Sequence, residues 1–227
     1  MSWHPLEELS QEQREKLHAY AAMLREMNRS INLVSREDEE RLFERHILHS
    51  LSLTFRKFPA GSTVVDWGTG GGLPAVPLAI AFSDVRIHAV DSVRKKVQAV
   101  RTMARRLGLE NLDTWHGRAE AYPGDADFSV SRATASLSVL WSWHARVAVG
   151  RAGTEEAGET APDGSLWHPG LICLKGGDIA NEITDLQRSE PHVHIQNHPL
   201  ADISPAAYGT PNFAGKMIVE CRAAEVN

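Results

Sequence analysis

A glycine-rich loop that follows an acidic residue holds the clearest chemical signal in the sequence. Residues 65–74 read Val-Asp-Trp-Gly-Thr-Gly-Gly-Gly-Leu-Pro, so Asp66 lies at the end of a β-rich run and Gly68 and Gly70 open a tight turn. Glycine allows the backbone to approach a ligand closely. The same residues could also serve only as a structural turn between a strand and a helix. The charges near the loop must therefore indicate what it binds.

These charges favour S-adenosylmethionine (SAM) over a dinucleotide. The third glycine of a G-x-G-x-x-G motif that starts at Gly68 would fall on Leu73, and Asp66 would repel a pyrophosphate. SAM instead carries an ammonium and a sulfonium, which favour a nearby negative charge. Asp91, at the end of the next strand-like run, is placed to accept hydrogen bonds from ribose hydroxyls. The pattern is typical of SAM-dependent methyltransferases.

Two further positions fit the same ligand. Residues 117–120 read Gly-Arg-Ala-Glu and follow a third strand-like run, where the backbone and the Glu120 carboxylate could contact an adenine. Arg132 follows a fourth such run, where cofactor and substrate would meet. Glu120 can equally be an ordinary surface carboxylate, so the sequence leaves that contact open.

The elements that must position these residues alternate between strands and helices from residue 62 onward. We expect strands at 63–67, 85–90, 112–115, 128–131, 171–174, 193–196 and 217–221, and helices at 73–82, 93–107, after 131 to about 149, and 178–188. This alternation predicts an α/β, Rossmann-like fold with a mostly parallel seven-stranded sheet. The last two strands, joined by a loop without a helix, are expected to form an antiparallel edge. Ligands of such sheets bind at the carboxyl ends of the strands.

Residues 1–60 are predicted to form a helical extension, which precedes a methyltransferase domain at 61–227. A stripe with helical spacing runs from Leu17 to Ile31. A second helix is expected around residues 43–51, with Phe43, Ile47 and Leu51 inward and with Arg45, His46 and His49 facing elsewhere. Residues 151–165, rich in Gly, Pro, Thr and acid, indicate a loop insertion.

Composition and charge restrict the class of protein. With 227 residues, 42% apolar and 23% charged, the chain suits one globular domain. No apolar run reaches the roughly 20 residues of a membrane span, and the N-terminus lacks the features of a signal peptide, so we expect a cytoplasmic protein. The chain has only two cysteines, and its histidines lack the spacing of metal ligands. We therefore expect neither a disulfide framework nor a metal site.

The basic residues are concentrated in one segment. The net charge of −5 argues against a protein that coats nucleic acid indiscriminately, yet residues 94–118 hold seven basic side chains against two acidic ones. These cations could hold RNA phosphates or could form the solvated face of an amphipathic helix. The sequence leaves both interpretations open.

Several ordered motifs resemble those of one family. Residues 27–35 (MNRSINLVS) resemble its W-N-x-x-x-N-L-T segment, and residues 45–51 (RHILHSL) resemble its R-H-I-L-D-S-L segment. Further matches follow in the same order at 66–74, 91–97, 117–120, 131–137 and 174–176. By this resemblance the chain is identified as a member of the bacterial 16S rRNA (guanine-N7) methyltransferase family, also called the glucose-inhibited division protein B family. The resemblance covers nearly the whole chain.

The resemblance implies an enzyme that methylates N7 of a specific guanine in 16S rRNA of the small (30S) ribosomal subunit, with SAM as its cofactor. It implies SAM contacts from Gly68, Leu73, Ala119, Glu120 and Arg132, with Asp66, Gly70 and Asp91 supporting the pocket. Candidates for RNA binding or for the catalytic region are Asn32, Arg45, His46, Arg132 and Lys175. Arg132 is the catalytic candidate, and we expect a monomer without metal or membrane contact.

The chain departs from the family pattern at several positions. Met27 replaces a usual tryptophan, His49 an aspartate, Trp67 a valine or isoleucine, and Ala75 a glycine. These departures leave the SAM interpretation intact and bear on the details of substrate binding.

The implied chemistry needs no general base, because guanine N7 has a free lone pair at neutral pH. Catalysis then depends mainly on alignment. The fourth strand is not followed by the Asn/Asp-Pro-Pro-aromatic motif that methylation of an exocyclic amine would lead one to expect, and neither cysteine is placed as a nucleophile. An assembled or assembling small subunit is the expected substrate, since RNA is read mainly where base edges are accessible.

Three alternatives stay open from the sequence. The first is a SAM methyltransferase for a small molecule or a protein. The second is a ribosome assembly factor that binds SAM without catalysis, and the last is an NAD(P) oxidoreductase.

Overall fold

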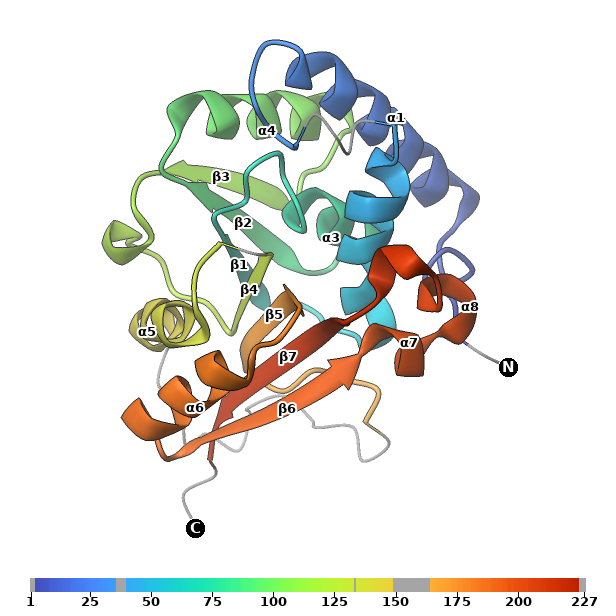
Figure 1. Ribbon diagram of the computed structural model, residues 1–227. Coiled ribbons are helices and arrows are strands. Elements are labelled where there is room, and N and C mark those ends of the chain that lie inside the picture. The colour runs from blue at the N-terminus through green and yellow to red at the C-terminus, as the bar shows by residue number, and fades with distance from the viewer. Residues whose placement is uncertain (1–2, 36–39, 133, 149–163, 225–227) are drawn as a thin grey trace.

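One mixed sheet of seven strands organises the described part of the chain, which comprises residues 3–35, 40–132, 134–148 and 164–224 of a computed structural model (Figure 1). The strands are β1 (Thr63–Trp67), β2 (Arg86–Asp91), β3 (Leu112–His116), β4 (Phe128–Arg132), β5 (Gly170–Gly176), β6 (Val193–Pro199) and β7 (Lys216–Ala223). They lie in the order β3-β2-β1-β4-β5-β7-β6. β1 to β5 pair in parallel, whereas β7 runs antiparallel to both β5 and β6. The predicted Rossmann-like fold with an antiparallel edge is confirmed.

Helices cover both faces of this sheet, as buried parallel strands require (Figure 1). One face carries α1 (Gln11–Asn28), α3 (Ala75–Ala81) and α4 (Arg94–Arg106), and the other carries α5 (Leu137–Val147) and α6 (Ala180–Ser189). Alternate residues of β1 enter two separate cores, Val64 on the α1 side and Val65 and Trp67 on the α5 side. The glycine loop that follows β1 is therefore anchored between two packed layers.

The connection between β6 and β7 is more ordered than the predicted loop. It contains α7 (Leu200–Ile203), α8 (Pro205–Tyr208) and the short 3-10 helix η5 (Pro211–Phe213). Ser204 caps α8, since its hydroxyl accepts a hydrogen bond from the Ala207 N–H at 3.3 Å. The expectation of a connection without a helix is therefore wrong, although each helix is only four residues or fewer.

The second helical segment of the N-terminal extension is not one regular α-helix. It consists of the π-helix η2 (Phe43–Leu48), the short α2 (His49–Leu51) and the 3-10 helix η3 (Ser52–Phe55). A π-turn is wider than an α-turn and therefore changes the directions of the side chains that follow it.

Two histidines of this segment that were expected to face away from the core are buried. His46 and His49 are 8% and 5% exposed, while Ile47 and Leu51 are fully buried as predicted. The segment also has neighbours on more than one side, because it contacts α1 and because the Tyr208 hydroxyl donates to its backbone. The expected orientation of His46 and His49 is therefore wrong.

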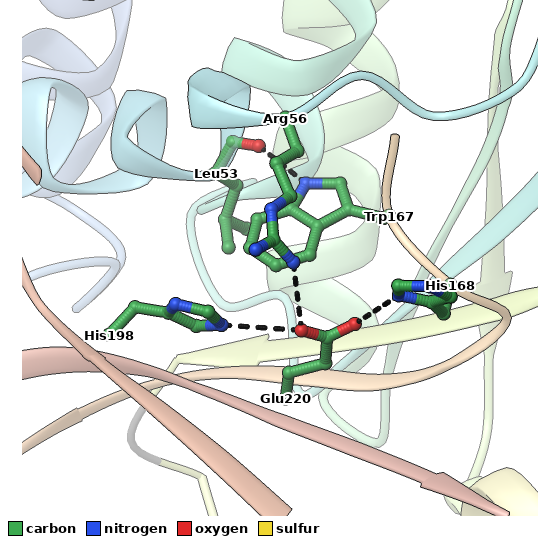
Figure 2. A network of polar contacts seen from close by, with 6 residues as sticks. All are labelled: Leu53, Arg56, Trp167, His168, His198 and Glu220. Carbon is green, nitrogen blue, oxygen red and sulfur yellow. Dashed lines mark hydrogen bonds and ion pairs between the residues drawn. The ribbon is translucent and has the colours of Figure 1, made fainter. Parts of the chain in front are cut away.

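A buried carboxylate ties the end of the extension to the antiparallel edge of the sheet. Glu220 on β7 accepts hydrogen bonds from Arg56 at 3.1 Å, His168 Nδ1 at 3.1 Å and His198 Nε2 at 3.2 Å (Figure 2). Burial alone would raise the pKa of Glu220, but the hydrogen bonds from the two histidines and the charge of Arg56 outweigh it and lower the pKa to about 2. The carboxylate is thus ionised at neutral pH.

An indole lies over the cationic end of this network. The Trp167 ring lies 5.1 Å from the Arg56 guanidinium carbon, and its Nε1 donates to the Leu53 carbonyl at 2.9 Å (Figure 2). Trp167 precedes β5 in the chain and Leu53 belongs to η3, so the ring links the extension to the sheet a second time.

Two sequence predictions can be compared only with the residues that the structure describes. Of the predicted insertion at 151–165, residues 151–163 lie outside them. Within them, no helix is long and apolar enough to cross a membrane.

Candidate active site

A cavity of about 470 Å³ lies at the carboxyl ends of β1, β2, β3 and β4. It is lined by seven of the eight residues predicted to bind or support a cofactor, namely Gly68, Gly70, Leu73, Asp91, Ala119, Glu120 and Arg132. Four further residues that were not predicted to bind the cofactor also line the wall, namely Leu33, Lys96, Thr134 and Trp143. The structure thus gathers positions that are more than sixty residues apart in the chain.

The glycine loop forms the floor of the cavity with a backbone that other residues rarely adopt. Gly68 and Gly70 have φ angles of +69° and +58°. A Cβ on Gly68 would lie 2.3 Å from the Thr134 side chain, so a side chain at this position would also collide with the segment after β4. The glycines therefore serve both the turn and the close approach of the two segments that flank the cavity.

Asp91 joins the two loops beside the cavity. One carboxylate oxygen accepts from the Gly70 N–H at 3.0 Å, and the other accepts from the Val93 N–H at 2.8 Å. A carboxylate has about four lone-pair sites, so this residue keeps acceptor capacity for ribose hydroxyls at the surface of the cavity.

Asp66 is the one predicted cofactor residue that does not line the cavity. It is fully buried beneath the loop, where it accepts a hydrogen bond from the Ala75 N–H at 3.1 Å. Burial raises the pKa of its carboxyl to about 7, against the opposing effects of that hydrogen bond and of the Arg132 charge. Asp66 thus lies beneath the glycine loop and does not reach the cavity surface.

Trp143 closes the end of the cavity that Ala119 and Glu120 line. Its Nε1 donates to the Glu120 carboxylate at 3.1 Å, and its ring lies 6.1 Å from that of Trp67. The sequence offered no signal for this role, because Trp143 lies within a helix whose apolar residues are explained by core packing. The Glu120 carboxylate is exposed but held in place by this contact.

A basic side chain at the end of β4 also lines the cavity and is contacted by the N-terminal extension. Arg132, the last residue of β4, donates from its guanidinium to Nδ1 of His46. Arginine has no acceptor, so Nδ1 must be unprotonated in this contact. Burial, together with the charges of Lys216 and Arg132, keeps the pKa of the neighbouring His49 well below its ordinary value. His46 of the extension therefore helps to position Arg132.

Comparison with known proteins identifies the family. The model of the GidB family, described as rRNA small subunit methyltransferase G, matches residues 13–153. The chain belongs to this family. A relative named ribosomal RNA small subunit methyltransferase G, from Salinibacter ruber, is 49% identical over 203 residues, which cover 89% of this chain and 91% of the relative. A relative of the same name from Bacteroides fragilis is 41% identical over 177 residues, covering 77% of this chain and 80% of the relative.

Solved structures show the same fold. A SAM-dependent methyltransferase from Aquifex aeolicus aligns with a TM-score of 0.53 at 15% identity and covers 84% of this chain and 96% of its own. A geranyl diphosphate C-methyltransferase from Streptomyces coelicolor, solved with S-adenosyl-L-homocysteine, has a TM-score of 0.53 at 13% identity and covers 84% of this chain and 82% of its own. The fold is that of SAM-dependent methyltransferases, and this GidB-family chain is an enzyme of that class.

The RNA-binding candidates of this GidB-family chain differ in their surroundings. Asn32 is exposed and adjoins Leu33, which lines the cavity. Arg45 is half-buried, with its Nε 3.4 Å from the Asn212 amide oxygen. Lys175 is buried, and its ammonium faces other protein groups. The structure therefore brings His46 and Arg132 together and leaves Asn32, Arg45 and Lys175 at separate places around them.

Metal ligands do not gather at the cavity. Within the described ranges no group of three or more His, Cys, Asp or Glu side chains is arranged to hold a metal ion. Cys173 and Cys221 are both buried free thiols.

Proposed function

We propose that this chain transfers the methyl group of SAM to N7 of a specific guanine in 16S rRNA. The observation that carries the proposal is the cavity, where a positive-φ glycine loop, two acids and a guanidinium meet in a chain that belongs to a small-subunit rRNA methyltransferase family. The backbone at Gly68 and Gly70 would hold the amino-acid part of SAM. The Asp91 carboxylate would hold the ribose, and the part of the cavity lined by Glu120 would hold the adenine.

The groups at the reacting end suit a nucleophile that needs no deprotonation. SAM supplies an electrophilic methyl group, and guanine N7 offers a lone pair without losing a proton. The acids that line the cavity are Asp91 and Glu120, whose carboxylates are held by the loop amides and by Trp143. His46 Nδ1 is occupied by Arg132. N7 methylation requires no base from these groups, so their engagement in other contacts is compatible with the reaction.

Arg132 is the residue to which we assign guanine orientation. Its guanidinium can donate to the guanine O6, which lies beside N7 on the same edge of the base. Since His46 fixes the guanidinium from behind, the base can be held with N7 directed along the methyl–sulfur axis. Alignment, rather than acid–base chemistry, then supplies the rate enhancement.

The exposed cations near the cavity are suited to RNA phosphates. Arg94 and Lys95 at the start of α4 are exposed, and Lys96 and Arg118 line the cavity. We infer that the substrate is an assembled or assembling small subunit, because the basic side chains are concentrated at residues 94–118 of an otherwise acidic chain.

The proposal is tested by methyl transfer from labelled SAM to small-subunit particles that lack the modification, followed by mapping of the labelled base. The expected product is a single N7-methylguanine in 16S rRNA. Measurable SAM binding without incorporation, or label on an exocyclic amine or a pyrimidine, would overturn it. Arg132→Ala is expected to reduce kcat by about a hundredfold or more, because the base loses its alignment. Equal activity on protein-free rRNA would remove the preference for assembled particles.

A further inference from the structure

Lys175 lies in a setting that does not suit a phosphate contact. Its side chain is 7% exposed, and its ammonium points into the protein. The Nζ atom donates to the Ala135 carbonyl at 2.6 Å and to Glu182 Oε2 at 2.8 Å. Two of the three N–H donors are thus engaged, and the side chain is almost closed to solvent.

Glu182 uses the same oxygen to cap a neighbouring helix. Oε2 accepts the Leu137 N–H at 2.8 Å, and Leu137 is the first residue of α5. The N-cap residue of this helix, Ser136, makes no capping hydrogen bond with its own side chain. Glu182 comes from α6, so a residue 45 positions further along the chain satisfies an N–H group at the helix start and places negative charge at the helix N-terminus.

The segment between β4 and α5 is therefore held at two ends. Thr134 lines the cavity, and its hydroxyl donates to the Trp67 carbonyl at 3.1 Å. Ala135, the next residue, and Leu137, three residues on, are held by the pair formed by Lys175 and Glu182. This segment begins two residues after Arg132, and its Thr134 side chain lies against Gly68, so its position affects the shape of the reacting end of the cavity.

We propose that Lys175 and Glu182 are positioning residues that fix the 134–137 segment for methyl transfer, and that Lys175 does not contact RNA phosphate. This inference rests on the proposed function. Methyl transfer to N7 depends on alignment, and a displacement of about 1 Å at a reacting centre can reduce the rate by about a hundredfold. A pair that holds the segment beside Arg132 therefore affects kcat without touching the substrate.

The variant Lys175→Met separates the two roles of the lysine. As a positioning residue, Lys175 is needed for turnover, so kcat at saturating SAM and particles is expected to fall at least tenfold. The slope of log Kd for rRNA against log salt is expected to stay as in the wild type. Loss of one phosphate contact would instead change that slope by about 0.7 to 0.9 and leave kcat at saturation intact, and this result would overturn the proposal. Lys16→Met, in an exposed pair with Glu12 on α1, is the matched control for loss of a lysine.

Two variants of Glu182 separate the hydrogen bonds from the charge. Glu182→Gln keeps an oxygen for both Lys175 and Leu137 and is expected to retain kcat within about threefold of wild type. Glu182→Ala removes the acceptor and is expected to lower kcat as Lys175→Met does. A Glu182→Ala enzyme with wild-type kcat contradicts the inference. A purely structural pair would lower the melting temperature of both variants while kcat per folded molecule stayed unchanged, which would also contradict it.

Amide hydrogen exchange tests the pair without methyl transfer. Exchange in residues 137–141 of the full chain is expected to be faster in Lys175→Met and Glu182→Ala than in wild type, and unchanged in α4. If the wild-type chain transfers no methyl group, the proposed function fails. Faster exchange in the two variants would still support the inference that Lys175 and Glu182 hold this segment in place. Unchanged exchange in both variants would refute the positioning role whatever the activity.

Discussion

At the end of the cavity where we place the adenine, the Trp143 indole holds the Glu120 carboxylate. Trp143→Phe keeps an aromatic ring and removes the donor. We expect the Kd for SAM to rise about fivefold, since one hydrogen bond of this kind contributes about 1 kcal/mol. Calorimetry measures the change, and Trp3→Phe is the control, because Trp3 packs against Phe55 and Tyr208. An unchanged Kd for Trp143→Phe would mean that the hydrogen bond from the indole to Glu120 does not contribute to SAM binding.

Asp66 is expected to make SAM binding depend on pH. Its pKa is about 7 in the free protein, so the carboxyl is mostly protonated below pH 7 and ionised above it. A cationic ligand favours the ionised form, and the Kd should therefore fall as the pH rises from 6 to 8. Titrations across this range test the effect, with Asp66→Asn as the comparison, because the amide keeps an oxygen for the Ala75 N–H. A pH profile that is equally steep in Asp66→Asn would assign the dependence to another group.

The residues of the cavity divide into those that the sequence could predict and those that it could not. Gly68 and Asp91 follow from their positions at strand ends, where a parallel sheet must bind its ligands. Trp143 and Thr134 reach the cavity from a helix and a connecting segment whose orientation is set only by packing on the sheet. The motif at 174–176 pointed to Lys175 as a functional candidate. It could not show that the side chain is buried, because the burial depends on Glu182 in the next helix.

At the scale of elements, Glu220 joins β7 to β6 and to the end of the N-terminal extension. Glu220→Gln leaves Arg56 without its charged partner, and we expect the free energy of unfolding to fall by about 3 kcal/mol at pH 7. The folded-state pKa of about 2 lies below the ordinary value of 4.5, so this stabilisation is present above pH 4.5 and is lost as the pH falls toward 2.

Urea unfolding at several pH values measures both effects. The difference between wild type and Glu220→Gln should narrow below pH 4.5. Glu12→Gln, in an exposed pair with Lys16, should change stability by less than about 1 kcal/mol. A gap that stays constant from pH 7 to pH 3 would contradict an ionised, stabilising Glu220.

Helices and strands could be predicted where the spacing of apolar residues in the sequence matches the residues that are buried in the structure. α4 has buried residues at helical spacing, and Gly108 adopts a φ of +66° just after its end. The strands are short apolar runs bounded by turn residues. The π-turn at 43–48 was not predictable, because its sequence has ordinary helical spacing and its contacts come from α1 and from the distant 204–215 connection.

At the scale of the whole molecule, the charge distribution should orient the RNA. Arg105 and Arg106 are exposed on α4, whereas the chain as a whole has a net charge of −5. Replacing both by Glu is expected to weaken binding to rRNA and to reduce the salt slope by about 0.7 to 0.9 for each lost phosphate contact, with the Kd for SAM unchanged.

Filter binding or fluorescence anisotropy at several salt concentrations measures this effect. Arg188→Glu on α6, which covers the opposite face of the sheet, is the control. An equal loss of affinity in Arg188→Glu would show that total charge, and not the α4 surface, determines binding.

The position of β7 has a consequence for the order in which the chain can fold during synthesis. β7 lies between β5 and β6 although it follows both in the sequence, and its Glu220 meets Arg56 across 164 residues. Until β7 leaves the ribosome, the apolar edge of β5 is unpaired and Arg56 has no carboxylate to bind. A nascent chain therefore cannot complete its sheet step by step, and a product truncated before β7 exposes a strand edge that is prone to aggregation.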